Sequence, residues 1–304
     1  MSVNVLRSTL LAASRSHRLR HGVERFGPTK SVVDRFVGGT TVNDVVQVTS
    51  ALRSSGLLST IDHLGEDVTN ERGADLTVAA YLELLEHLSG TCDEDVSVKL
   101  TALGLSHDAT GALERARTIV LAAAQRNVTV TIDMEASALT NVTLEIVREL
   151  RKQTPSVAAV LQAMLRRTES DAHELGAEGA RVRLCKGAYG EESAVAFSGR
   201  EPIRASYVRS LRALWDSPGT PLVATHDPEM VAAASELAQH APRFFEYQML
   251  YGVRGDEQIR LARAGHRVRV YVPYGSEWYG YLVRRLAERP ANLAFFLRSL
   301  SSKN

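Results

Sequence analysis

The 304-residue sequence predicts an α/β fold, a distorted (βα)8 or TIM barrel with an N-terminal helical arm and a last helix that caps the active site. From residue 57 onward, eight short β-branched or apolar runs alternate with helical stretches of about ten to twenty residues. Eight such units in roughly 250 residues match this barrel in number and size. A doubly wound sheet, the main alternative, usually has fewer strands and a glycine-rich first turn, and the chain contains no G-x-G-x-x-G.

The arm is expected over residues 1–56 and the barrel over residues 57–304. Three helices are predicted in the arm, at 3–16, near 27–39 and at 41–56, the last with a threonine at its start and a glycine at its end. The strands are predicted at 57–65, 96–103, 128–134, 157–164, 181–189, 221–226, 244–250 and 267–274. Helices are predicted at 72–88, 110–126, 140–152, 168–176, 202–215, 228–239, 255–264 and 278–291.

Polar side chains stand where the predicted strands end. In a (βα)8 barrel the chemistry lies at the carboxyl ends of the strands, so these positions are the first candidates for a site. They are Lys99, Asp133, Gln162, Arg183 with Lys186, Thr225 with His226, Gln248 and Tyr271, and Asp62 with His63 can complete the ring. Seven of the eight strands thus end in a polar group that a purely structural strand would not need.

Composition narrows the class of protein. The chain is 44% hydrophobic with a formal net charge of +1, which argues against a nucleic-acid binder. Its first 30 residues carry six Arg or Lys and one acidic residue, a composition typical of a transit peptide, of a helix resting on an anionic membrane, or of a frayed basic helix. No run of eighteen apolar residues occurs, and Cys92 and Cys185 alone suggest no disulfide framework. We therefore expect a cytoplasmic protein, with peripheral contact at the inner face of the cell membrane.

The predicted last helix carries a cationic face. Tyr281, Arg284, Arg285 and Glu288 are related by steps of three and four, so they share one side of the helix. Adjacent guanidinium groups repel unless an anion lies between them, and their planar donors match a carboxylate or a phosphate. A solvated amphipathic helix is the alternative, but the five aromatic residues between Tyr271 and Tyr281 favour a small-anion site.

A basic and glycine-containing segment follows the fifth predicted strand. Gly187 lets the backbone approach a ligand closely, and Lys186 can hold a diphosphate, serve as a Schiff-base lysine, or simply extend along the rim. In the next unit Asp227 and Pro228 are expected to cap a helix, whose start favours phosphate oxygens together with Thr225 and His226.

The third predicted strand ends in two carboxylates. Asp133 and Glu135 point to opposite faces if the strand persists, and Asp133 is expected to face the mouth of the barrel because Ile132 and Met134 share the other face. Lys99, from the neighbouring unit, is then placed to pair with Asp133.

Together these segments resemble the proline dehydrogenase family, including the catalytic barrel of the bifunctional proline-utilisation enzymes. The similarity spans about residues 57–296 and rests on VSVKLTALG, TIDME, LQAML, RVRLCKGAY, ATHD, FEYQMLYG and YVPYG followed by YLVRRLAE, in this order. It implies an enzyme that uses FAD to oxidise L-proline to Δ1-pyrroline-5-carboxylate, the first step of proline catabolism to glutamate. It also implies a membrane quinone as electron acceptor and functional coupling to pyrroline-5-carboxylate dehydrogenase.

The resemblance also implies residue roles. Asp133 and Arg183 would be the catalytic residues, with Arg183 donating to the flavin. The proline site would consist of Lys99, Leu250, Tyr271, Tyr281, Arg284, Arg285 and Glu288, with Tyr189 near its opening. The cofactor would be held by Met134, Gln162, Arg183, Lys186, Gly187, Ala188, Thr225 and His226. Three positions depart from the family pattern: Gly190 stands where an aromatic residue is common, Cys185 where valine is, and Asp227 where asparagine is.

Two other functions fit the residues without the resemblance. A barrel lyase using Lys186 or Lys99 as a Schiff-base or phosphate-binding lysine would need no flavin. A barrel that has lost catalysis would serve as a binding protein, although the retained Arg284, Arg285 and Asp133 argue against it.

Overall fold

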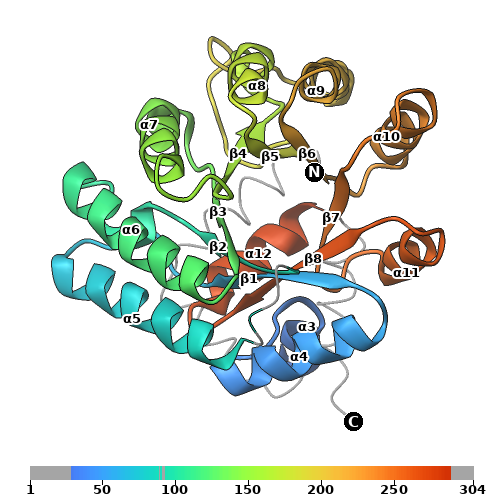
Figure 1. Cartoon of the computed structure of the whole chain (residues 1–304). Coiled ribbons are helices and arrows are strands. Elements are labelled where there is room, and N and C mark those ends of the chain that lie inside the picture. Colours follow the sequence, from blue (N-terminus) through green and yellow to red (C-terminus); the bar gives the residue numbers. More distant parts are fainter. Residues whose placement is uncertain (1–28, 89, 91–92, 289–304) are drawn as a thin grey trace, which may run out of the picture.

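The computed structural model describes residues 29–88, 90 and 93–288, with the helical residues 29–32 and 284–288 described by their backbone only (Figure 1). The helix predicted at 3–16 and Cys92 lie outside the described residues.

Eight parallel strands close into a barrel in sequence order, each hydrogen-bonded to the next and β8 to β1. The strands are β1 (Leu58–His63), β2 (Glu94–Val98), β3 (Thr129–Ile132), β4 (Ala158–Gln162), β5 (Arg181–Cys185), β6 (Thr220–Ala224), β7 (Glu246–Leu250) and β8 (Val268–Tyr274). The predicted fold class is therefore confirmed, and every strand lies within or beside the run that predicted it.

Seven helices surround the strands in the view down the barrel (Figure 1). They are α5 (Glu71–His87), α6 (Ala109–Gln125), α7 (Thr140–Arg151), α8 (Thr168–Ala177), α9 (Arg200–Trp215), α10 (Pro228–His240) and α11 (Gly255–Arg263). The outer faces of the strands pack against them through buried aliphatic residues such as Val96, Ile132 and Val270. Burial of one such side chain contributes about 1.5–3 kcal/mol, so this shell holds the ring of helices to the barrel.

The helix that follows β8 does not join this ring. α12 (Trp278–Glu288) lies inside the ring of outer helices in Figure 1, and its Tyr281 and Leu282 pack with Phe36 and with Leu64, just beyond the carboxyl end of β1. The predicted capping position of the last helix thus agrees with these contacts.

The outer place beside β8 is taken by a helix from the N-terminal segment. α4 (Val42–Ser54) packs against β1 and β8, and in Figure 1 it lies between α5 and α11. Its start is fixed by a capping box, in which Thr41 accepts from the Asp44 N–H and Asp44 accepts from the Thr41 N–H, as the threonine predicted. α3 (Thr29–Phe36) precedes it. The division at residue 56 remains a prediction, but α4 forms part of the barrel wall.

Six strands end before their predicted boundaries, and the second and fifth do so by the largest margins, at residue 98 instead of 103 and at residue 185 instead of 189. β2 stops at Val98, and residues Thr101–Leu103 form a 3-10 turn, η1, because the Glu135 carboxylate accepts hydrogen bonds from the Thr101 N–H and hydroxyl. β5 stops at Cys185, and the chain then turns through Gly187 at a φ of +94°. A second 3-10 turn, η2 (Ser137–Leu139), precedes α7. Both early stops place polar residues in loops at the mouth of the barrel.

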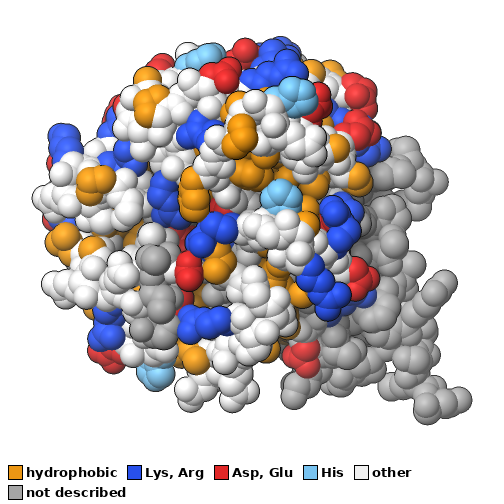
Figure 2. Space-filling view, turned by 45° about the vertical axis from the view of Figure 1, so that its right-hand side comes forward, with side chains coloured by type: hydrophobic (Ala, Val, Ile, Leu, Met, Phe, Trp, Pro, Cys, Tyr) orange, Lys and Arg blue, Asp and Glu red, His pale blue; other side chains and the backbone are white. Residues whose placement is uncertain are grey.

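On the face shown in Figure 2, charged side chains of both signs are interspersed with hydrophobic ones. This distribution agrees with the net charge of +1. Among the described residues, no helix is long and apolar enough to cross a membrane.

Candidate active site

The inside of the barrel is polar, unlike the branched aliphatic filling that is usual in this fold. Arg183 on β5 shows this most directly, because its guanidinium hydrogen-bonds to Ser97 on β2 (2.7 Å) and Gln248 on β7 (2.5 Å), neither of which is on a neighbouring strand. Such contacts must cross the interior. Because side chains alternate along a strand, residues two positions before or after Arg183, Ser97 and Gln248 on their own strands also face the interior.

Four residues meet at the carboxyl end of β1, β2, β3 and β8. The Lys99 ammonium lies 2.7 Å from Asp62, 3.5 Å from Asp133 and 3.3 Å from the Tyr271 hydroxyl. The Tyr271 hydroxyl in turn donates to Asp133 (2.8 Å). The expected pairing of Lys99 with Asp133 is therefore present, but the nearer carboxylate is Asp62, which the sequence placed only at the edge of the ring.

Burial and charge set the ionisation of this group. Burial opposes the charged form of Lys99, but the carboxylates of Asp62 and Asp133 raise its pKa well above the ordinary value, so the amine stays an ammonium ion. Burial also opposes ionisation of Asp133, yet the charges of Lys99 and Arg183 lower its pKa. For Asp62 burial dominates and raises the pKa to about 6. Lys99 is thus in the state that binds an anion, not in that of a Schiff-base lysine.

Arg183 connects this group to the centre of the barrel. Its guanidinium donates to Asp133 (2.9 Å), and it lies over the Tyr271 ring at 5.4 Å from the ring centre. Asp133 also accepts from the Ser97 hydroxyl (2.8 Å). Asp133 therefore orders Lys99, Tyr271 and Arg183 together, which agrees with the expected position of its side chain at the mouth.

A hydrogen-bonded column continues below Arg183. The Gln248 amide oxygen accepts from Arg183, and its amide nitrogen donates to Glu246 (2.6 Å). Glu246 pairs with Arg269 (2.7 Å), which is 1% exposed. The column fixes the orientation of the Gln248 amide and, through it, one edge of the Arg183 guanidinium.

The prediction that Asp133 and Glu135 point to opposite faces of one strand was wrong in its reason, because residues two apart share a face of a strand. β3 ends at Ile132, so both carboxylates lie beyond it, and Glu135 is directed to Thr101 and not to Lys99. It is buried and accepts both hydrogen bonds from Thr101. Its backbone carbonyl accepts from the Gln162 side chain (2.7 Å), and Gln162 is almost fully buried at the end of β4. Met134, between the two carboxylates, is also buried.

A second cluster lies after β5 and β6. Asp227 forms ion pairs with Lys186 and with Arg204 on α9 (2.8 Å), and Arg200 lies 3.9 Å away. Asp227 also accepts from the Glu229 N–H at the start of α10, so the expected helix cap is confirmed. Burial opposes its ionisation, but hydrogen bonds from Arg204 and Lys186 lower its pKa well below the ordinary value. Arg204 also pairs with the carboxylates of Glu201 (3.2 Å) and Glu229 (2.6 Å), so the cluster has as many carboxylates as cations. Its guanidinium and ammonium groups are donors of the kind that bind a phosphate.

The backbone beside this cluster allows a close approach. A Cβ on Gly187 would lie 2.6 Å from the Met164 side chain and 3.0 Å from the Gln162 amide oxygen. Only glycine fits there, both in space and in backbone conformation. The following Ala188 is exposed, and burial raises the pKa of the nearby Cys185 thiol to about 11, which keeps that thiol unreactive.

Thr225 and His226 are held by neighbouring backbone. The Thr225 hydroxyl accepts from the Asp227 N–H (3.1 Å), and His226 Nε2 accepts from the Leu250 N–H (2.9 Å). The neutral imidazole therefore carries its proton on Nδ1. Arg254 donates to the His226 carbonyl (2.6 Å) from the loop after β7.

Two residues of the expected hydrophobic wall are neighbours. Leu250 and Tyr271 are paired across β7 and β8. Tyr281, 6% exposed, reaches the same end of the barrel from α12. Arg284, Arg285 and Glu288 lie in the backbone of α12, and their side chains are outside the described residues.

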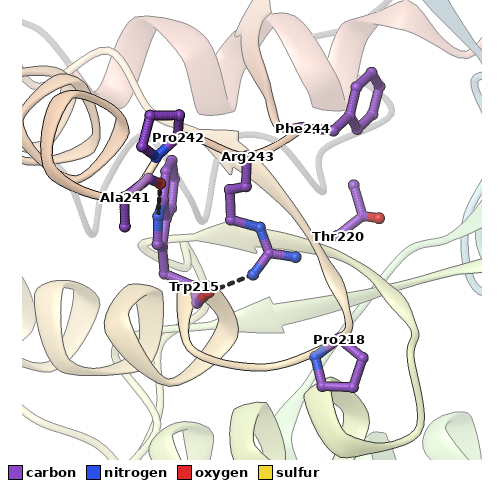
Figure 3. A pocket seen from close by; sticks show the side chains of 7 residues that line it. All are labelled: Trp215, Pro218, Thr220, Ala241, Pro242, Arg243 and Phe244. Carbon is purple, nitrogen blue, oxygen red and sulfur yellow. Dashed lines mark hydrogen bonds between the residues drawn. The ribbon is translucent and has the colours of Figure 1, made fainter.

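The opposite end of the barrel has a hollow of about 480 Å³, lined by residues that precede β6 and β7 (Figure 3). Arg243 stands in it and donates to the backbone carbonyls of Leu214 (3.0 Å), Trp215, Ser217 (2.8 Å) and Gly219. The guanidinium thus closes the loop between α9 and β6. Polar groups at this end of the fold serve stability, so we do not place the site here.

The sequence missed several residues of the mouth and of the column below it. They are Asp95, Ser97, Arg204 and Arg254. A signal for two of them existed: Asp95 and Ser97 alternate with Lys99 along one strand, as Thr129, Thr131 and Asp133 do along the next. Two such polar alternations in adjacent strands indicate a polar barrel interior.

Comparisons with known proteins agree with this geometry. A family model described as proline dehydrogenase matches residues 45–298. Proline dehydrogenase 2 of Bacillus subtilis is 35% identical over 306 residues, with 98% of this chain and 100% of the relative covered. Proline dehydrogenase 1 of the same organism is 36% identical over 303 residues, with 98% and 100% covered.

A solved structure shares the fold. It is proline utilization A (PutA) from Bdellovibrio bacteriovorus inactivated by N-propargylglycine, with a TM-score of 0.78 and 25% identity. The match covers 85% of this chain and 32% of that chain. Since the family model spans most of the sequence and the Bacillus relatives match it almost end to end, this chain belongs to the proline dehydrogenase family, whose activity is the oxidation of proline.

Proposed function

We propose that this enzyme oxidises L-proline to Δ1-pyrroline-5-carboxylate with FAD as its cofactor and a membrane quinone as the electron acceptor. The observation that carries the proposal is the pairing of two adjacent sites at one end of the barrel. One is the ammonium of Lys99 beside Tyr271 and Leu250. The other is the backbone at Gly187 together with the ion cluster of Lys186, Arg204 and Asp227.

The residues after β5 and β6 fit a dinucleotide cofactor. Lys186, Arg200 and Arg204 supply cationic donors for a diphosphate, and the lack of a side chain at Gly187 lets Met164 and Gln162 pack directly against this backbone. We assign Thr225, His226 and Ala188 to the same part of the cofactor. Met134, Gln162 and Arg183 would contact its flavin ring. When bound, the flavin supplies the acceptor for the hydride that leaves the substrate carbon.

The substrate is assigned to the space under α12. Arg284 and Arg285 would clamp its carboxylate together with Lys99, and Glu288 would hold one of the two guanidinium groups. Leu250, Tyr271 and Tyr281 would form the apolar wall around the pyrrolidine ring and exclude water from it. Asp133 keeps Lys99 and Tyr271 in place through direct contacts, so we assign it, with Arg183, to the catalytic group.

The acceptor and the next enzyme are also part of the proposal. A quinone acceptor implies peripheral membrane contact, for which the basic N-terminal 30 residues are the candidate segment. The similarity to proline utilization A, of which this chain covers 32%, supports functional coupling to a pyrroline-5-carboxylate dehydrogenase.

The visible spectrum of the purified protein tests cofactor and substrate together. We expect a flavin spectrum that bleaches on anaerobic addition of L-proline, and not with D-proline or glutamate, because the carboxylate clamp and apolar wall fix one enantiomer of a cyclic amino acid. Release of the cofactor by denaturation and mass measurement distinguishes FAD from FMN. A colourless protein that takes up no added FAD would contradict the proposal.

A further inference from the structure

Lys99 has two carboxylate neighbours, and they differ in how many other groups they serve. Asp133 accepts from Ser97, Arg183 and Tyr271, and its distance to the Lys99 ammonium is 3.5 Å. Asp62 lies at 2.7 Å from the same ammonium, and its buried Oδ2 atom has no hydrogen-bond partner among the described residues. Within the described part of the chain, the Lys99 ammonium is therefore the main partner of Asp62, whereas Asp133 is shared among four groups.

The backbone holds Asp62 rigidly. It lies within β1 and is paired in register with Ser97 on β2 and with Pro273 on β8, and it is 1% exposed. Lys99, by contrast, follows the last residue of β2, and its long side chain has many rotamers. The fixed Asp62 carboxylate can therefore hold the flexible Lys99 side chain in one position.

We propose that Asp62 is a positioning residue that holds the Lys99 ammonium at the barrel mouth for the substrate carboxylate, and so leaves Asp133 to Tyr271 and Arg183. This inference rests on the proposed role of Lys99 in the proline site. Without the charge of Asp62, Lys99 would turn toward Asp133, the next carboxylate, and away from the place where it meets the substrate. The loss would appear in substrate binding, because neither Asp62 nor the displaced ammonium transfers hydride.

Steady-state kinetics of Asp62→Asn, Lys99→Met and the double variant test the proposal. We expect Asp62→Asn to raise the KM for L-proline about tenfold, with kcat changed less than about threefold, which is the size of coupling expected between contacting charged residues. In the Lys99→Met background the same change should alter KM by less than about twofold, because Asp62 then has nothing to position. Asp171→Asn is the matched control, since it removes a buried carboxylate that pairs with Arg167 on the outer helix α8 and not with the Lys99 group, and it should leave KM unchanged.

The outcomes separate this inference from the function it rests on. If Lys99→Met does not raise KM, the proposed role of Lys99 fails. If Lys99→Met raises KM but Asp62→Asn does not, or if Asp62→Asn causes the same loss in both backgrounds, only the positioning role is overturned. Should Asp62→Asn alone not fold, the comparison of Lys99→Met with the double variant still decides, since a further rise in KM above about twofold contradicts the proposal.

Discussion

Arg269 and Arg183 both point into the barrel, from β8 and β5, but they bind different kinds of partner. Arg269 pairs with Glu246 and donates to the backbone carbonyls of Ser59 (2.7 Å) and Asp93 (2.7 Å). Arg183 binds side chains, among them Asp133 at the mouth (2.9 Å). Both are nearly inaccessible, at 1% and 5% exposure. Burial alone therefore does not distinguish the two arginines, but their partners do: Arg269 holds backbone carbonyls besides Glu246, whereas the guanidinium of Arg183 binds side chains.

Gln248 connects the Arg269–Glu246 pair, toward the amino end of the barrel, with Arg183, toward its carboxyl end. Its amide oxygen accepts from Arg183 and its nitrogen donates to Glu246, the partner of Arg269. The pair at the amino end thus acts as a rigid base, on which the carboxyl-end group is oriented. Changes at the base should lower stability, and changes at the mouth should alter ligand binding, and this difference can be measured.

The largest effect on the free energy of unfolding is expected at the Arg269–Glu246 pair. Arg269→Met should destabilise the protein by about 3–5 kcal/mol, because it leaves the Glu246 carboxylate buried without its main partner. Denaturant unfolding measures the change. The double variant Arg269→Met with Glu246→Leu should recover most of the loss, since it removes both buried charges. If Arg269→Met were as stable as the parent, the Arg269–Glu246 pair would not support the residues above it.

An intermediate effect is expected at the mouth. Gly187→Ala should reduce the flavin bound per protein, because a Cβ would strain the backbone and press on Met164, at a cost of about 1–3 kcal/mol. The flavin-to-protein absorbance ratio measures it. Gly190→Ala is the control three residues later, where nothing lies within 4 Å of the added Cβ. Equal flavin loss in both variants would place the cofactor elsewhere.

The smallest effect is expected at Asp227, the cap at the start of α10. Asp227→Asn keeps a capping side chain but removes the charge that Lys186 and Arg204 bind, and should lower the melting temperature by about 3 °C at pH 7. Because the pKa of Asp227 is depressed in the folded state, its charge contributes stability above the unfolded value of about 3.9, and this contribution is lost as the pH falls below that value.

Melting curves of both proteins between pH 3 and pH 8 measure this dependence. The difference between parent and variant should be constant above about pH 5 and shrink below about pH 4. A difference that stays the same at all values of pH would mean that the charge of Asp227 contributes nothing.

The sequence by itself determined the barrel and its local features. Short β-branched or apolar runs predicted the strands, Thr41 and the Asp227–Pro228 pair predicted helix starts, and the ends of the predicted strands indicated Lys99, Asp133 and Lys186. These features depend on a few adjacent residues, so the local pattern carries them. The early stops of β2 and β5 were not predicted, because they depend on Glu135, which lies 34 residues from Thr101, and on a turn at Gly187.

Only the tertiary structure decided which charges meet. Asp62 reaches Lys99 from 37 residues away, and Arg183 finds Gln248 65 residues later, because barrel closure brings strands to one axis that are far apart in the chain. It also placed α4 in the wall beside β8. A local pattern cannot predict these contacts, since each depends on the register of every strand between the two partners.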